Sequence, residues 1–253
     1  GDGTAVGVVN VQDNALLSLN TRTTIGSTGT GTVNQTGGTV HIRAVPGTSL
    51  EEADLLIGDG VDGHGTYNLS AGTLQVDKYF AVGHWTAQDA TLNISGGNLD
   101  VGLDLGAGIR VQAGSSVKGF INQTGGAVRV GQNLRLAERD PDPANGTDSR
   151  GEYHLKGGSL KVEGTVSAGT GDSGALFEFS GGTFSPHVFS GANLGGGLTQ
   201  TSTSSASKLE AVTQDVAITG FYSVTSGDAS AAAGKSISVS GLTSTNVLAN
   251  FSG

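Results

Sequence analysis

The stretch GTYNLSAGTL, residues 65–74, decides the fold because close relatives of it recur along much of the chain. Apolar and polar residues alternate on both sides of Ala71-Gly72, a pattern typical of two short β-strands joined by a tight turn. A weaker relative opens the series, with Asp13-Asn14 at the turn. The seven units are GVVNVQDNAL (7–16), GTVNQTGGTV (31–40), GTYNLSAGTL (65–74), ATLNISGGNL (90–99), GFINQTGGAV (119–128), GEYHLKGGSL (151–160) and ALFEFSGGTF (175–184).

Most units continue into a third short strand that ends in Gly or Ala. After the turn of the third unit, for example, the apolar residues are Leu74, Val76, Phe80 and Val82, followed by Gly83. One unit is too small to bury its apolar face, but stacked units bury it and bring like residues into rows. Two such rows would be Val33, Tyr67, Leu92, Ile121, Tyr153 and Phe177, and Gln35, Leu69, Ile94, Gln123, Leu155 and Phe179.

This pattern predicts an all-β chain folded as a right-handed parallel β-helix, or solenoid, of about seven coils. Parallel crossovers prefer the right hand, and the Gly pair supplies corners that need positive φ. A β-propeller is the alternative repeat fold, but its blades need about 40 residues, whereas these units start 24 to 34 residues apart. The buried Gln residues of the second row would need polar partners, such as backbone carbonyls at a corner.

Composition changes after about residue 195, which predicts three parts. Residues 1–195 form the β-helix repeat domain, the Gly/Ser/Thr-rich segment 196–207 is a linker, and residues 208–253 form a β-rich C-terminal segment. The alternation in 215–224 and 235–242 favours strands there. A capping box at Ser207–Glu210 leaves a helix as the weaker alternative.

The composition excludes several classes of chemistry and partner. Among 253 residues there is no Cys, so no disulfide or thiolate site exists, and the formal net charge is −9. An acidic chain poor in Lys and Arg is a poor partner for nucleic acid or an anionic membrane, and no apolar run is long enough for membrane insertion. Because Met is also absent, even at position 1, we expect an exported chain whose signal peptide has been removed; a trimmed chain is the alternative.

The connections from the third strand to the next unit vary in length and all leave one edge of the predicted rod, which would make a contact surface there. The richest loop, residues 138–152, holds Asp140, Asp142 and Asp148, whose carboxylates could bind calcium. Asp59 and Asp62 form a second, weaker candidate calcium site. The loops also include Trp85, which could stack on a sugar ring, cover a corner or contact another subunit.

Two outward rows of polar residues are candidates for a functional surface. The first holds Asn34, Asn68, Asn93 and Asn122, then His154 and Glu178; these Asn residues, like Asn145 and Asn250, precede Ser or Thr by two and form glycosylation sequons. Stacked Asn amides hydrogen-bonded along the rod are the alternative that we favour. The second row holds His41, Gln75, Asp100, Arg129, Lys161 and Ser185. It has one carboxylate where glycoside hydrolysis needs two, so we expect no enzyme.

The ends carry the functional prediction. A rod of stacked coils exposes an unpaired strand edge unless a cap covers it, and the six residues before Gly7 are too few for a capping helix. The C-terminal segment could cap its own rod, or it could reach the bare edge of the next molecule. Head-to-tail contacts of the second kind generate a filament.

The units GTYNLSAGTL and ATLNISGGNL resemble the Gly-rich β-strand repeats of bacterial autotransporter passenger domains and PEP-CTERM-type exported proteins, over roughly residues 7–195. The resemblance implies a secreted or surface-exposed β-helix with a structural or adhesive role. We therefore expect an extracellular structural subunit that assembles with itself into a filament or surface layer. An adhesin that binds glycans through the one-sided loops is the alternative, and a polysaccharide lyase or hydrolase is less expected.

Overall fold

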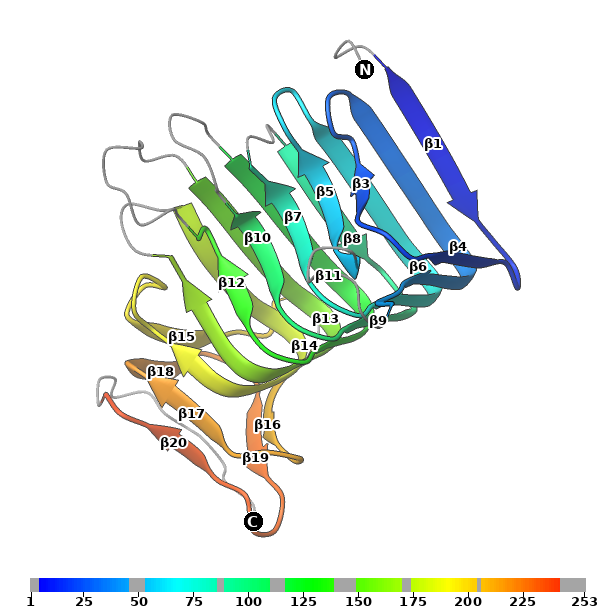
Figure 1. Ribbon diagram of the computed structural model, residues 1–253. Coiled ribbons are helices and arrows are strands. Elements are labelled where there is room, and N and C mark those ends of the chain that lie inside the picture. Colours follow the sequence, from blue (N-terminus) through cyan, green and yellow to red (C-terminus); the bar gives the residue numbers. More distant parts are fainter. Residues whose placement is uncertain are drawn as a thin grey trace.

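The computed structural model describes residues 5–45, 53–85, 89–109, 117–138, 149–169, 174–203 and 206–241. In these ranges the chain consists of β-strands and turns, with no α-helix. The prediction of an all-β chain is therefore confirmed. The strands stack side by side from β1 (Val6–Val11) at one end to β20 (Ile237–Val239) at the other (Figure 1).

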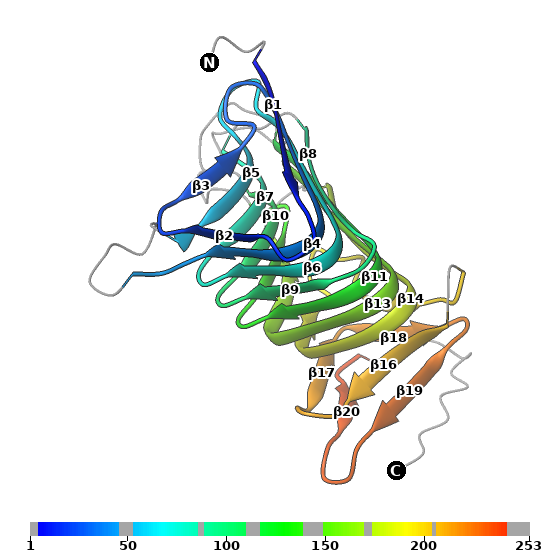
Figure 2. The same cartoon turned by 90° about the vertical axis from the view of Figure 1, so that its right-hand side faces the viewer.

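The strands form three rows in which every pair of neighbours is parallel (Figure 2). Row 1 contains β1, β4 (Thr30–Ile42), β6 (His64–Val76), β8 (Asp89–Ile94), β11 (Val117–Val130), β13 (Ser149–Ala168), β14 (Gly174–Ser190), β15 (Gly197–Gln200) and β18 (Phe221–Val224). Row 2 contains β2 (Leu16–Leu19), β9 (Asn98–Val101), β16 (Ser207–Ala211), β19 (Asp228–Ala231) and the later parts of β4, β6, β11, β13 and β14. Row 3 contains β3 (Thr23–Ile25), β5 (Leu55–Asp59), β7 (Phe80–His84), β10 (Leu105–Ile109), β12 (Leu134–Leu136), β17 (Val216–Thr219), β20 and the ends of β13 and β14. We call three consecutive strand segments, one from each row, a coil.

The register places equivalent residues of successive units opposite each other, as their alignment predicts. Val33 pairs with Tyr67, and Tyr67 pairs with Leu92. These side chains point into the space that the three rows surround and are buried, whereas the residues before and after each of them are partly exposed. The three rows therefore enclose one continuous apolar core. Figure 2 shows the stacked strands of the rows obliquely.

The corner between rows 1 and 2 depends on glycine. The last glycine of each turn has positive φ, between 66° and 83°, at Gly38, Gly72, Gly97, Gly126, Gly158 and Gly182. Asp13 adopts φ 55° in the first, weaker turn, and Asp is one of the few non-glycine types that tolerates this region. Corners also lie close together along the stack: a Cβ added at Gly158 would lie 2.3 Å from the carbonyl oxygen of Gly126.

Buried glutamines tie neighbouring coils together at the same corner. The Nε2 of Gln35 donates to the carbonyl oxygens of Gly38 and Thr73, at 3.3 and 2.9 Å, and its Oε1 accepts a 2.6 Å bond from the Tyr67 hydroxyl. Carbonyl partners at a corner were expected from the sequence and are confirmed. Burial raises the pKa of Tyr67, so the phenol remains a donor. The same arrangement joins Gln123 to Tyr153.

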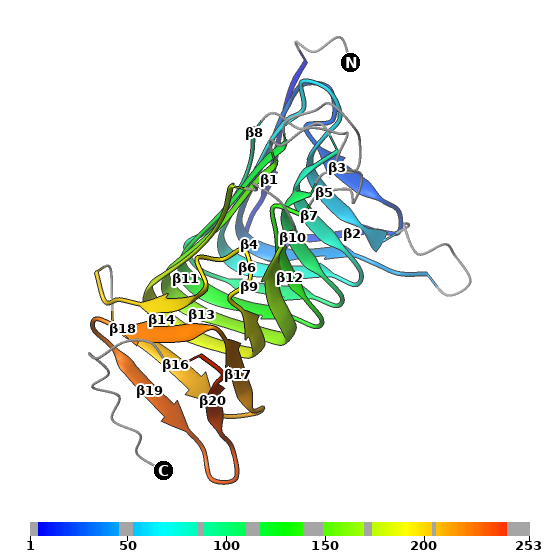
Figure 3. The ribbon, with the colours of Figure 1, turned by 90° about the vertical axis from the view of Figure 1, so that its left-hand side faces the viewer.

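Residues 197–239 extend the same three rows (Figures 1 and 3). β15 lies within the expected linker 196–207 and pairs with β14 through Phe179 and Gln200. β18, β19 and β20 then pair with β15, β16 and β17. The described strands thus make nine coils where the sequence predicts seven, and Gln200 accepts a hydrogen bond from Tyr222 just as Gln35 does from Tyr67. The division into domains at residues 195 and 207 stays a prediction, although strand pairing continues across it.

A substitution at one corner glycine tests this packing. Gly158→Ala should lower the free energy of unfolding by at least about 2 kcal/mol, because the residue has positive φ and its methyl group would meet the Gly126 carbonyl. Urea titration followed by circular dichroism measures the loss. Gly7→Ala is the matched control, since a Cβ there meets nothing within 4 Å. Equal stability of the two variants would contradict the corner geometry.

Candidate functional site: the open face of the first coil

The first coil presents three strand edges that no strand of the described residues covers. β1 and β2 pair on one side with β4, and β3 pairs on one side with β5. The backbone N–H and C=O groups along the other side of β1 point away from the stack. Such an edge is a template for a further strand.

Apolar side chains are concentrated at this edge. Val6, Val8 and Leu16 are 74%, 58% and 73% exposed. Val9, which pairs with the buried Val33 in the core-facing row, is 47% exposed. Val9 therefore covers Val33 on one side while its own other side faces solvent.

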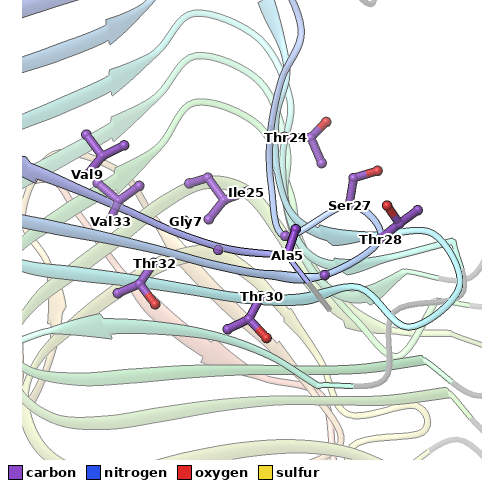
Figure 4. Close-up of a pocket in the computed structure, with 13 residues that line it drawn as sticks. Ala5, Gly7, Val9, Thr24, Ile25, Ser27, Thr28, Thr30, Thr32 and Val33 are labelled. Carbon is purple, nitrogen blue, oxygen red and sulfur yellow. The ribbon is translucent and has the colours of Figure 1, made fainter. Parts of the chain in front are cut away.

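Beside these residues the end of the core opens into a groove of about 360 Å³ between β1, β3 and the start of β4 (Figure 4). Ala5, Val9, Ile25 and Val33 provide its apolar wall, and glycine, serine and threonine residues provide the rest. No ionisable side chain lines the groove. The arrangement can bind an apolar strand or loop, but it offers no acid, base or nucleophile pair for catalysis.

Of the two predicted calcium sites, the structure describes only the weaker one, Asp59 and Asp62. Asp140, Asp142 and Asp148 lie outside the described residues. Asp59 accepts a 2.8 Å hydrogen bond from His84 Nδ1, and Asp62 adopts φ 61° in the adjacent turn. Among the described residues no group of three or more His, Asp or Glu side chains is arranged to hold a metal ion.

The second outward row is in register from His41 to Ser185. Its charges are paired. Arg129 donates to Asp100 at 2.8 Å and to Glu163 at 2.9 Å, and these bonds raise the pKa of Arg129. His41 lies 2.7 Å from Asp77, whose side chain also binds Gln75 and the Ala44 N–H. The row is a surface network of ion pairs and hydrogen bonds.

The predicted ladder of Asn amides is present on the outer face of row 1. Asn34 donates to Asn10 at 3.0 Å, and the chain of bonds continues through Asn68 and Asn93 to Asn122 at 2.9 to 3.0 Å. Asn10 extends the predicted ladder by one coil, and the sequence GVVN at the start of the first unit is its signal. The sequons at Asn145 and Asn250 lie outside the described residues.

At the next two coils the row changes to a cluster of charged side chains. His154 Nε2 lies 2.9 Å from Glu152, and its Nδ1 lies 2.6 Å from Glu178. Burial raises the pKa of the Glu178 carboxyl, but hydrogen bonds from His154 and from Ser180 oppose this, and the net effect lowers it. The folded state therefore favours the charged form of Glu178.

Comparisons of the chain with family models, with curated proteins and with solved structures give no match, so the site is interpreted from its geometry. In the described part of the chain there is no helix with the length and apolar character needed to cross a membrane.

The state of Glu178 gives a pH-dependent prediction. Folding lowers the pKa of Glu178 below its ordinary value of 4.5. The charged carboxylate therefore stabilises the folded state above pH 4.5, and this stabilisation is lost as the pH falls through the lowered pKa. At neutral pH, Glu178→Gln should have a lower free energy of unfolding than the wild type. The difference in free energy of unfolding between the two should become smaller below pH 4.5. Urea unfolding across this range measures it. Ser180→Ala, which removes the hydrogen bond from Ser180 to Glu178, should lower the free energy of unfolding at neutral pH by a smaller amount. Parallel stability curves for wild type and Glu178→Gln would contradict the assignment.

Proposed function

We propose that this chain is a right-handed parallel β-helix that serves as an extracellular structural subunit, and that copies join end to end through the open face of the first coil. The single observation that carries the proposal is the combination of unpaired strand edges with half-exposed core residues, Val9 above all. A second copy would supply both the missing strand hydrogen bonds and an apolar lid for the groove.

The coil geometry supports this mode of assembly. Parallel strands in consecutive coils require the chain to turn in one sense, and right-handed crossovers are strongly preferred. A subunit docked on the first coil with its own strands parallel would prolong all three rows. The contact joins two different surfaces, so it does not close on itself and leads to a filament or surface layer.

An extracellular location is part of the proposal and rests on the resemblance of the repeat to exported β-strand-repeat proteins. The proposal assigns the chain no catalytic activity and no cofactor. Calcium at Asp140, Asp142 and Asp148 remains an expectation about the longest loop.

A second candidate function is glycan binding by a surface-exposed adhesin. The observation in its favour is Trp85, which is 42% exposed at the end of β7, where a variable loop begins. Aromatic rings at such positions stack on sugars. We rank this function second because Trp85 stands at the edge of one coil, whereas the open first coil presents a strand edge and an apolar groove together.

The test is a charge placed in the groove. Val9→Asp should leave the fold intact, because this residue is half-exposed. It should weaken end-to-end association by roughly 100- to 4,000-fold, since an unpaired carboxylate buried at an interface costs about 3–5 kcal/mol. Light scattering after size-exclusion chromatography, together with electron microscopy, measures association. Val61→Asp, at a valine that is 64% exposed and does not line the groove, is the matched control. A wild-type protein that stays monomeric at high concentration, or a Val9→Asp variant that assembles normally, would refute the proposal.

A further inference from the structure

Residues 247–253, VLANFSG, repeat the first half of the unit that builds row 1. They align with GTYNLSA at residues 65–71, so that Asn250 takes the place of Asn68. This segment lies outside the described residues, the last of which is Gly241. Because row 1 has a free edge at β1, the segment is a candidate for the strand that this edge lacks.

The ladder of Asn amides on row 1 has an open end at Asn10. Asn34 donates a 3.0 Å bond to the Oδ1 of Asn10, and the later Asn residues donate in the same direction. The side chain of Asn10 is exposed, and its Nδ2 donates to no side chain or carbonyl of the described residues. An Asn stacked before Asn10 in the same register would accept this bond through its own Oδ1. In the alignment of the units, that residue is Asn250.

The outward residue Val8 distinguishes β1 from the strands that follow it in row 1. The next three coils carry Thr32, Thr66 and Thr91 at this position, whereas Val8 is a valine that is 58% exposed. The same alignment places Leu248 opposite Val8. Apolar pairs across neighbouring strands stabilise the pairing. The segment and β1 therefore both have an apolar residue where the inner coils have threonine.

The groove beside β1 has room for the first side chain of the segment. The seven units have Gly or Ala where the segment has Val247, and a Cβ added at Gly31 would lie 2.4 Å from the backbone nitrogen of Gly26. In the first coil, a Cβ added at Gly7 meets nothing within 4 Å, and Gly7 lines the groove of about 360 Å³. A valine is therefore accommodated in a strand placed before β1, although it would not fit in the second coil.

The other place for the segment is β18 at the opposite end of its own chain, which pairs on one side with β15. The core residue of β18, Tyr222, is only 6% exposed, whereas Val9, in the same core-facing row of the first coil, is 47% exposed. Ala249 would cover Val9 in the aligned register. On β18 the outward neighbour of Tyr222 is Ser223, which has no amide to continue a ladder with Asn250. Both the apolar surface to be covered and the ladder favour β1.

We propose that residues 247–251 of one copy bind as a parallel strand along the free edge of β1 in the next copy. Val247 then enters the groove, and Asn250 accepts the hydrogen bond from Asn10. This inference rests on the proposed end-to-end assembly and names the segment that makes the contact. The contact joins two different surfaces, the C-terminal segment and the first coil, so the assembly has a direction.

Two chains that each carry a single Cys test the register, because the wild type has none. Asn10→Cys and Asn250→Cys, mixed under mild oxidation, should form a disulfide-linked dimer, since paired strands lie about 4.8 Å apart and this is within the Cα–Cα range of a disulfide. Neither chain holds both Cys residues, so this link must join two copies. Ser18→Cys is the matched control for Asn10→Cys, because Ser18 is exposed in the first coil but belongs to row 2. It should not link to Asn250→Cys, and mass spectrometry of the linked peptides identifies each dimer.

A charge in the segment tests the same contact without a cross-link. Val247→Asp should weaken association by roughly 100-fold or more, because an unpaired carboxylate would enter the apolar groove. Ser244→Asp is the matched control, since it adds the same charge to the same segment ahead of the proposed strand. Light scattering measures association, and circular dichroism checks that both variants are folded.

The inference is overturned if the wild type assembles but Asn10→Cys and Asn250→Cys do not link. That result would leave end-to-end assembly in place and show that something else occupies the edge of β1. It is also overturned if Ser18→Cys links as readily as Asn10→Cys, or if Val247→Asp assembles as well as Ser244→Asp. A wild type that stays monomeric at high concentration would instead refute the proposed assembly itself, and this inference with it.

Discussion

The structure depends on one constraint: each coil must lie on the previous one with equivalent residues in register. Parallel pairing at a constant strand separation enforces this, since a shift by one residue would turn every core side chain outward. The pairs Val33–Tyr67 and Tyr67–Leu92 show the constraint in the core, and Asn34–Asn68–Asn93 show it on the surface. The apolar core and the Asn ladder both follow from the same register.

The corners make this register possible. A side chain at Gly158 would collide with the carbonyl of the coil before it, and the six corners from Gly38 to Gly182 all have glycine with positive φ at this position. The Gln–Tyr pairs add polar bonds between coils at the same corner without leaving a buried polar atom unpaired. Because each coil pairs with the coils before and after it, the first coil has one edge without a partner among the described residues. The proposed assembly uses this edge.

Much of this could be predicted from the sequence because the repeat has a fixed phase. The alternation around Ala71-Gly72 gives the inward and outward rows, and it correctly places both the buried Gln residues and the Asn ladder. The last two coils were not predicted, because their corners lack the Gly-Gly pattern: β16 begins at Ser207, and β19 follows Gly227 at φ 120°. The recurrence of a Gln–Tyr pair, Gln200 with Tyr222, was the available signal. The groove of the first coil exists because Val9 and Ile25 cover Val33 only in part. The alternation of apolar and polar residues shows which side chains point inward, but not how much of Val33 they cover.

The register itself can be measured directly with spin labels, because the chain has no Cys of its own. Ser18 and Ser185 both point outward in row 2 and are separated by six steps of strand pairing. Cys is substituted at these two positions and spin-labelled. Pulsed electron–electron double resonance should then give one narrow distribution of label-to-label distances near 29 Å, which is about six times the strand separation of about 4.8 Å. A broad distribution, or a much longer distance, would contradict the stacked-coil account.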